Sequence, residues 1–172
     1  LFFRKGVFFI MKIQLIGTGT IPDMTNSASV LINDHILFDV PNGNLKAMIR
    51  QNIDILKIDT VIISHTHADH CFDMPFLLWY KEDYQKESKR LSTKIITDKI
   101  TQNTIENLID LSYFNSAKNA KKEFIDAEEV NNIEKICDDL QIFNEPIEHE
   151  HLTIKYANGK YKYRIDRRFD IL

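Results

Sequence analysis

The chain has 172 residues, which is long enough for one domain with a sizeable hydrophobic core. Hydrophobic residues make up 44% and charged residues 27%, the usual balance of a globular protein. The formal net charge of −3 excludes a general electrostatic pull toward nucleic acid. The two cysteines, Cys71 and Cys137, lie far apart in the sequence, so they predict no disulfide framework and favour a reduced, cytoplasmic setting.

The first ten residues differ in character from the rest of the chain. Residues 1–10 are mainly apolar with two basic side chains, but they lack the long apolar core and cleavage site of a signal peptide. They are also too short to span a membrane. We therefore expect no membrane partner, with weak attachment of these residues to a membrane surface as the alternative. We therefore expect an N-terminal extension at 1–10 and one domain at 11–172.

The first half of the chain predicts strands interrupted by one helix. Apolar runs predict strands at 12–16, 29–32, 35–39 and 60–64. The Asn33-Asp34 pair predicts a tight turn, and the apolar spacing over 44–52 predicts a helix. The run at 60–64 is continuously apolar, which suits a strand covered on both faces.

The second half predicts two helices and then a meander of strands. A partly helical segment is expected at 72–81 with Pro75 near its start, and a helix at 101–114 with Asp98 as a candidate cap. A polar linker is expected at 115–123. Strands are expected at 91–97, 123–125, 140–143, 147–151, 152–156 and 161–165, with an Asn158-Gly159 turn before the last. This order predicts an α/β (α+β) sandwich of sheets with helices outside.

The most informative motif is His65-Thr66-His67-Ala68-Asp69-His70, which directly follows the apolar run at 60–64. Imidazole and carboxylate groups are the ligands that zinc and related first-row metals favour. His65 and His67 lie two residues apart, so an extended backbone would point both side chains the same way. Asp69 and His70 follow after the chain turns and could face a second metal.

These residues resemble the signature of the metallo-β-lactamase fold superfamily. The strand and Gly-Thr-Gly-Thr turn at 11–20 resemble the branch that contains ribonuclease Z and related phosphodiesterases. Asp39, followed by the turn at 42–44, resembles the next strand end of that branch. The similarity covers 11–165 and implies the αββα sandwich of the superfamily.

The resemblance implies two zinc ions, with manganese or iron as alternatives. It implies that His65 and His67 bind the first metal, that Asp69 and His70 bind the second, and that Asp69 is the catalytic carboxylate. The shared metals would generate a hydroxide nucleophile near neutral pH, so hydrolysis would need no Ser or Cys nucleophile. The implied substrate is a phosphodiester, either a small molecule or nucleic acid. We also consider a homodimer as an assembly of this chain.

Two further roles are implied for other residues. A third ligand to the first metal should come from a later strand, and we favour His149, with His151 as the alternative. Asp39 is expected to orient a metal ligand from behind, with a helix cap or turn-forming carboxylate as the alternative. Cys71 is expected to be a buried small side chain, and Trp79 and Tyr80 to be packing residues rather than a substrate platform.

The chain departs from the family in two ways. Beyond 161–165 it lacks the Asp and the final His that complete the second metal site in family members, so we expect it to be incomplete at the C-terminus. Ala68, Asp73 and Phe76 stand where ribonuclease Z-like sequences have glycines, which favours a general metal-dependent phosphodiesterase over transfer-RNA processing. The second hypothesis is a non-catalytic, degenerate metal-binding fragment; the missing residues favour it for this chain, and the intact first half favours the hydrolase for its full-length parent.

Overall fold

The computed structural model describes residues 12–85 and 92–127 in full, and the backbone alone of three later strands at 134–137, 140–149 and 164–171. The predicted extension at 1–10 lies outside these ranges. Among the helices that the structure describes, none is both long enough and apolar enough to cross a membrane.

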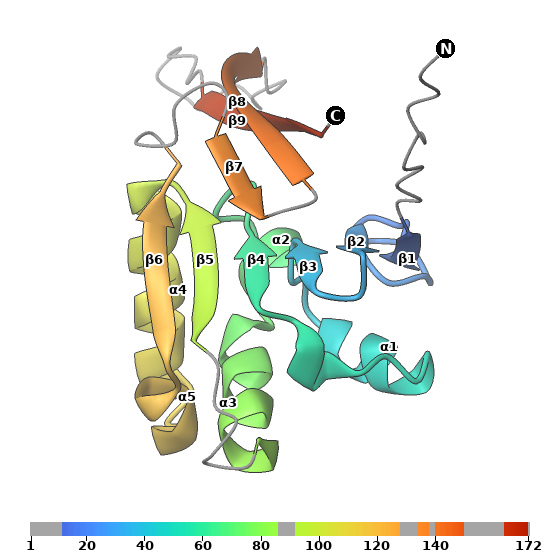
Figure 1. Cartoon of the computed structure of the whole chain (residues 1–172), viewed down its shortest axis with the longest axis vertical. Coiled ribbons are helices and arrows are strands. Elements are labelled where there is room, and N and C mark those ends of the chain that lie inside the picture. Colours follow the sequence, from blue (N-terminus) through green and yellow to red (C-terminus); the bar gives the residue numbers. More distant parts are fainter. Residues whose placement is uncertain (1–11, 86–91, 128–133, 138–139, 150–163, 172) are drawn as a thin grey trace, which may run out of the picture.

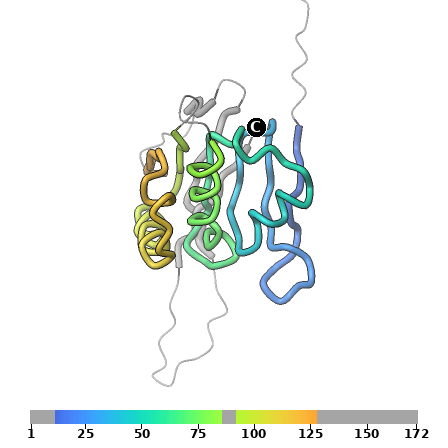
Figure 2. The backbone as a smooth tube through the Cα atoms, turned by 90° about the horizontal axis from the view of Figure 1, so that it is seen from below, coloured from blue at the N-terminus to red at the C-terminus, as the bar shows by residue number. Residues whose placement is uncertain are grey.

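Six strands form the main sheet, and their order in the sheet follows their order in the chain (Figures 1 and 2). They are β1 (Ile13–Gly17), β2 (Ser29–Ile32), β3 (Ile36–Phe38), β4 (Thr60–Ile62), β5 (Thr93–Thr97) and β6 (Lys122–Asp126). The first three strands pair antiparallel, whereas β3 to β6 pair parallel. The carboxyl ends of β3 and β4 therefore lie side by side at one edge of the sheet.

The connections between the parallel strands β3 to β6 carry the helices, which pack on one face of the sheet (Figure 1). They are α1 (Asn44–Arg50), the short 3₁₀ helix η1 (Ile55–Lys57), α2 (Ala68–Cys71), α3 (Met74–Tyr84), α4 (Lys99–Leu111) and α5 (Asn115–Asn119). Leu37, Val61 and Ile95 face the helices, where they pack with residues such as Met48 and Leu77. Burial of each such aliphatic side chain contributes about 1.5–3 kcal/mol to stability.

The opposite face of the sheet has its own apolar cluster. Ile36, Ile62 and Ile96 alternate in sequence with residues that face the helices, and all three are buried. Strands β4 and β5 are therefore covered on both faces, as the continuous apolar run at 60–64 predicts. These findings confirm the α/β fold class.

Several local predictions are confirmed. Asn33 and Asp34 have φ angles of 49° and 65°, as a two-residue turn with positive φ at both central positions requires. The Asp98 side chain accepts a hydrogen bond of 2.9 Å from the backbone nitrogen of Thr101 and so caps α4. Pro75 lies in the first turn of α3, where its missing N–H costs no helical hydrogen bond.

Gly17 is required by a close approach between backbone segments. A Cβ atom at this position would collide with the carbonyl oxygens of Ser27 and Asn26. The pairing of β1 with β2 also shifts register between Leu15 and Gly17. A glycine therefore lets the loop at 18–28 return close to the end of β1.

The predicted linker at 115–123 is wrong. This segment forms α5 and the first residues of β6. Ala117 and Ala120 are buried in the main core, although the segment is otherwise polar. These two small apolar side chains pack α5 and the residue after it against the core. Because the other residues of the segment are polar, the sequence shows no apolar pattern that would predict a helix.

A second sheet contains β7 (Glu134–Cys137), β8 (Leu140–His149) and β9 (Arg164–Ile171), in that order and antiparallel. The strands predicted at 140–143 and 147–151 are instead parts of the single strand β8. Pro146 does not interrupt it because β7 pairs only with its first residues, so among the described residues no strand pairs with that edge of β8 at the proline. β9 includes Arg164 and Ile165 of the strand predicted at 161–165 and runs on to Ile171, whereas residues 150–163, with the strand and turn predicted at 152–159, lie outside the described residues.

Lys81 is a buried lysine on α3. It is 3% exposed, and its ammonium group donates a hydrogen bond to the carbonyl oxygen of Ile58. Burial lowers the pKa of Lys81 to about 8, and the Asp59 carboxylate offsets part of this effect. The folded chain therefore releases this proton at a lower pH than the unfolded chain, in which the pKa of a lysine is about 10.4.

We expect Lys81 to contribute a rise in the free energy of unfolding as the pH increases from about 8 to about 10.4, because at this side chain the unfolded chain then binds more protons than the folded chain. The raised pKa of the buried Cys71 thiol acts in the opposite direction, so the contribution of Lys81 is measured as the difference between wild type and Lys81→Met. The pKa difference corresponds to about 3 kcal/mol. Lys81→Met should remove this rise, whereas Lys94→Met, an exposed lysine on β5, should keep it. Urea unfolding of the three proteins across this pH range measures the effect, and identical profiles for wild type and Lys81→Met would contradict it.

Candidate metal centre

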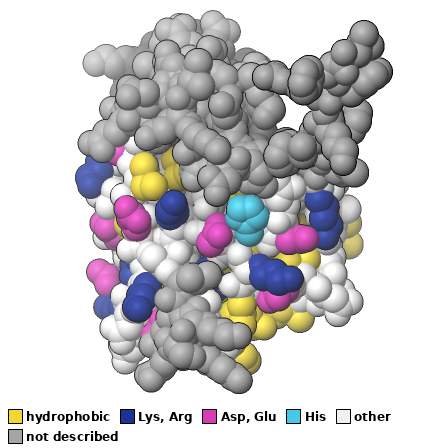
Figure 3. Space-filling model, viewed as in Figure 1, with side chains coloured by type: hydrophobic (Ala, Val, Ile, Leu, Met, Phe, Trp, Pro, Cys, Tyr) yellow, Lys and Arg dark blue, Asp and Glu magenta, His cyan; other side chains and the backbone are white. Residues whose placement is uncertain are grey.

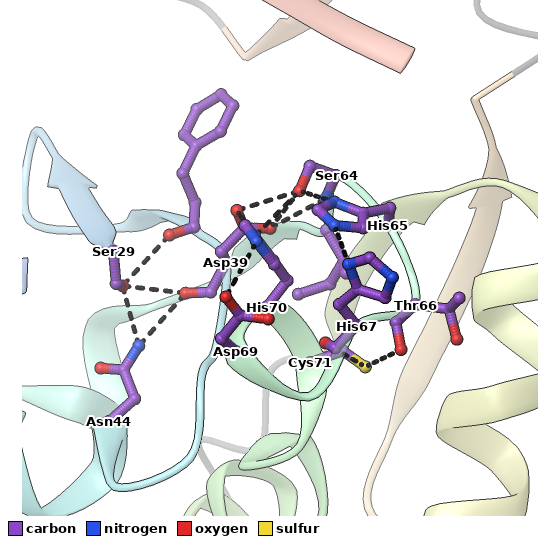
Figure 4. A network of polar contacts seen from close by, with 12 residues as sticks. Ser29, Asp39, Asn44, Ser64, His65, Thr66, His67, Asp69, His70 and Cys71 are labelled. Carbon is purple, nitrogen blue, oxygen red and sulfur yellow. Dashed lines mark hydrogen bonds and ion pairs between the residues drawn. The ribbon is translucent and has the colours of Figure 1, made fainter. Parts of the chain in front are cut away.

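The histidine motif lies at the carboxyl edge of the main sheet, where it runs from the loop after β4 into α2 (Figure 4). Asp39 follows β3 and lies beside it, because the backbone nitrogen of Asp39 donates a hydrogen bond of 2.9 Å to the carbonyl oxygen of Ile62 at the end of β4. The parallel pairing of β3 with β4 therefore brings Asp39 to the motif, although the two are far apart in sequence.

His65 and His67 form the first pair of candidate ligands. His65 Nε2 lies 3.0 Å from His67 Nδ1, and the two rings meet edge to face. Two nitrogen ligands of one tetrahedral zinc, each bonded at about 2.05 Å, lie about 3.3 Å apart. The spacing and the donor chemistry of this pair thus fit a divalent metal.

Asp69 and His70 form the second pair. Asp69 Oδ2 lies 3.7 Å from His70 Nε2, which again fits two ligands of one metal. The ring centroids of His65 and His70 are 3.9 Å apart, so the two pairs are adjacent. The motif thus presents two neighbouring pairs of donors from six consecutive residues.

Asp39 contacts the far side of the His70 ring. Its Oδ2 lies 2.8 Å from His70 Nδ1, and its Oδ1 accepts a hydrogen bond of 2.8 Å from the backbone nitrogen of Ser64. A carboxylate on the back nitrogen of a metal-binding histidine fixes the orientation of the ring. This contact is the one that a supporting role for Asp39 would require, and that role stays a prediction; the structure records no side-chain hydrogen bond from Asp39 that caps α1, the helix that follows it.

Asp39 adopts an unusual backbone conformation that two buried side chains support. Its φ angle is 55°, in the left-handed region that few side chains adopt. The Asp39 carbonyl oxygen accepts hydrogen bonds from Ser29 Oγ at 2.8 Å and from Asn44 Nδ2 at 3.2 Å. Ser29 and Asn44 are each at most 2% exposed, and Asn44 Nδ2 also donates to Ser29 Oγ at 2.8 Å.

Sequence reasoning missed three residues of this network, namely Ser29, Asn44 and Ser64. The signal for Ser64 was its place between a buried strand and the first histidine, where a polar side chain must face the site or remain unsatisfied. No comparable signal marked Ser29 or Asn44, because their importance comes from the fold bringing β2 and α1 to the end of β3.

The buried Cys71 side chain also contacts the backbone of the loop that holds the motif. Cys71 is fully buried, and its thiol donates to the carbonyl oxygens of Thr66 and His67 at 3.5 Å and 3.4 Å. Burial, with the nearby Asp39 and Asp69 carboxylates, raises the pKa of the Cys71 thiol to about 12. Cys71 is therefore a protonated packing residue, as expected from the sequence, and Trp79 and Tyr80 likewise pack against the core.

Asp73 joins the loop to α1. Its carboxylate accepts hydrogen bonds from the backbone nitrogens of Gly43 at 3.0 Å and Leu45 at 2.9 Å. Burial raises the pKa of Asp73, and these backbone hydrogen bonds oppose the increase. The residue that replaces a family glycine thus has a structural role at the start of α1.

Within the part of the chain whose side chains are described, no group of three or more His, Cys, Asp or Glu residues is arranged to hold a metal. Each pair would therefore need at least one further ligand. His149 is the last residue of β8, but its side chain lies outside the described residues, as does all of His151. The predicted third ligand thus stays a prediction.

Comparisons with known proteins agree with this architecture. Ribonuclease Z of Staphylococcus epidermidis is 41% identical over 76 residues, which cover 44% of this chain and 24% of that protein. Human tRNase Z, short form, superposes with a TM-score of 0.61 at 18% identity and is matched over 95% of this chain and 65% of its own. The metallo-beta-lactamase fold protein YhfI from Bacillus subtilis gives a TM-score of 0.62 at 18% identity, over 94% and 58% of the two chains. The matched region spans less than two thirds of each of these three proteins.

The fold and the motif together define a metallo-β-lactamase fold protein of the ribonuclease Z-like branch, which confirms the resemblance seen in the sequence. A family model matches residues 11–165 and assigns the chain to one family. The chain belongs to the family described as anti-Pycsar protein Apyc1.

Proposed function

We propose that this protein is a metal-dependent hydrolase that cleaves phosphodiesters. The observation that carries the proposal is the pair of adjacent donor sets, His65 with His67 and Asp69 with His70, at one edge of the sheet. Two divalent metals bound side by side would lower the pKa of a bound water and stabilise charge on the phosphoryl oxygens. Zinc suits the imidazole and carboxylate donors best, and manganese and iron are alternatives.

In this proposal the side chains have distinct tasks. His65 Nε2 and His67 Nδ1 hold one metal, and Asp69 Oδ2 and His70 Nε2 hold the other. Asp69 is also the candidate catalytic carboxylate, because it is the carboxylate within the motif. His149, or alternatively His151, completes the first set.

We favour a small phosphodiester over a large nucleic acid as the substrate, on the basis of the net charge and of the one face drawn in Figure 3. Acidic and basic side chains are interspersed on the face drawn in Figure 3, and the net charge is −3. Proteins that bind nucleic acid through its phosphates gather Lys and Arg on one face. Ribonuclease Z and tRNase Z are named for RNA. In this chain Asp73 stands where ribonuclease Z-like sequences have a glycine, and its carboxylate holds the start of α1.

A second candidate function is metal binding without turnover. The observation that favours it is that the described residues supply two ligands to each set and no third. A site with only two protein ligands holds a metal weakly.

One assay separates the two functions. The 172-residue chain is stripped of metal with a chelator, zinc or manganese is added back, and release of p-nitrophenol from bis(p-nitrophenyl) phosphate is followed. Metal-dependent release from this diester, with much slower release from the monoester p-nitrophenyl phosphate, would support the hydrolase. Because the sequence lacks the Asp and the final His that complete the second metal site in family members, we expect this release to be slow. A chain that binds metal but does not hydrolyse the diester would overturn the hydrolase proposal and support metal binding alone.

A further inference from the structure

The Ser64 hydroxyl lies between the two donor pairs and contacts residues on both sides (Figure 4). Its Oγ is 3.0 Å from each oxygen of the Asp39 carboxylate, 2.9 Å from His65 Nδ1 and 3.3 Å from His70 Nδ1. We propose that Ser64 is a positioning residue that fixes the tautomer of His65 and, together with Asp39, links one ligand of each metal in a single hydrogen-bond network. This inference rests on the proposed metal site.

The hydrogen atoms of the network can be assigned from Asp39. An ionised carboxylate only accepts hydrogen bonds, so every group that contacts it must donate. His70 Nδ1, at 2.8 Å from Asp39 Oδ2, must therefore carry a hydrogen. In its neutral form an imidazole has one N–H, so the lone pair of neutral His70 is on Nε2, which lies 3.7 Å from Asp69 Oδ2 and is too far away to donate a hydrogen bond to it.

The same reasoning passes through Ser64 to His65. The serine hydroxyl has one hydrogen, and the carboxylate of Asp39 is a stronger acceptor than a neutral imidazole. Ser64 thus donates to Asp39 and accepts from His65 Nδ1. His65 then carries its hydrogen on Nδ1 and directs the lone pair of Nε2 toward His67.

The network therefore prepares both histidines to bind through Nε2 before a metal arrives. Outer hydrogen-bond partners of this kind usually change metal affinity by about 10-fold to 100-fold. Ser64 is well placed for the task because its backbone nitrogen also donates to Asp39, at 2.8 Å, which holds the residue even when its hydroxyl is removed. A variant without the hydroxyl should therefore keep the Asp39–His70 contact.

Long-range ¹H–¹⁵N NMR of the metal-stripped protein tests the assignment, because it distinguishes histidines protonated on Nδ1 from those protonated on Nε2. In the wild type we expect His65 and His70 both to be protonated on Nδ1. In Ser64→Ala, His65 should gain a substantial Nε2-protonated population while His70 stays unchanged, and Ser64→Thr should restore the wild-type pattern. Ser112→Ala, which removes a hydroxyl at the end of α4, is the matched control and should have no effect.

Metal titration of the same proteins gives the second readout. We expect Ser64→Ala to bind the first zinc about 10-fold to 100-fold more weakly than wild type, and Ser64→Thr to bind it normally. His65 protonated on Nε2 in the wild type, or an unchanged tautomer in folded Ser64→Ala, would overturn the inference. Because the tautomer is read without metal, failure of this role is distinct from failure of the metal site, which would appear as a wild-type protein that binds no zinc.

Discussion

Replacing both His65 and His67 by alanine should weaken zinc binding by roughly a hundredfold or more, since loss of the ligands themselves exceeds the loss caused by their outer partners. The first donor pair disappears, and the remaining pair, Asp69 and His70, has too few ligands to hold a metal firmly. His67 is exposed and His65 is partly exposed, so the change should leave the core intact. Elemental analysis after dialysis, together with the p-nitrophenol assay, measures the loss.

The control for this experiment is His35→Ala. His35 pairs with Asp59 at 3.1 Å and lies just before β3, whereas Asp39 and the metal site lie beyond its other end. We expect this variant to retain wild-type zinc content. If the double variant at His65 and His67 retained its metal as well, the site assignment would be wrong.

Asp39→Asn should lower the affinity for the second metal by about 10-fold to 100-fold. Asparagine tolerates the left-handed backbone at this position and has nearly the same shape, so the fold should persist. The amide has no negative charge and can turn its NH₂ group toward His70 Nδ1, which weakens the preference for a hydrogen on that nitrogen. Competition with a chromophoric chelator measures the two affinities separately.

Asp34→Asn provides a closely matched control. Asp34 also has a positive φ angle and an ion pair, in this case with Lys12 at 2.6 Å, but it lies in the turn between β2 and β3. Its substitution should leave both metal affinities unchanged. Equal losses for the two variants would show that charge in general, rather than the Asp39–His70 contact, controls binding.

The strands and turns of the main sheet could be predicted because their signals are local. The apolar run at 60–64, the Asn33-Asp34 turn and the Asp98 cap each depend on neighbouring residues, and all three are confirmed. The prediction failed where tertiary contacts decide the structure. α5 forms because Ala117 and Ala120 fit into the core. β8 continues through Pro146 because, in the part of the chain that the structure describes, no strand pairs with one of its edges at that residue.

In the candidate site, too, the residues of the local motif could be predicted from the sequence, whereas the residues brought there by tertiary contacts could not. The motif could be read directly, since its candidate ligands come from six consecutive residues. The supporting residues could not, because Ser29 and Asn44 reach Asp39 only through the pairing of β2 with β3 and the position of α1. Asp39 was identified by resemblance, and the contact that explains it, from its carboxylate to His70 Nδ1, exists only once β3 and β4 are paired.

An anomalous difference map from zinc-soaked crystals of this chain tests the central claim most directly. We expect two neighbouring peaks, one bonded to His65 Nε2 and His67 Nδ1 and the other to Asp69 Oδ2 and His70 Nε2, at bond lengths of about 2.0–2.2 Å. Peaks that lie away from these atoms, or that bind His65 or His70 through Nδ1, would contradict the account.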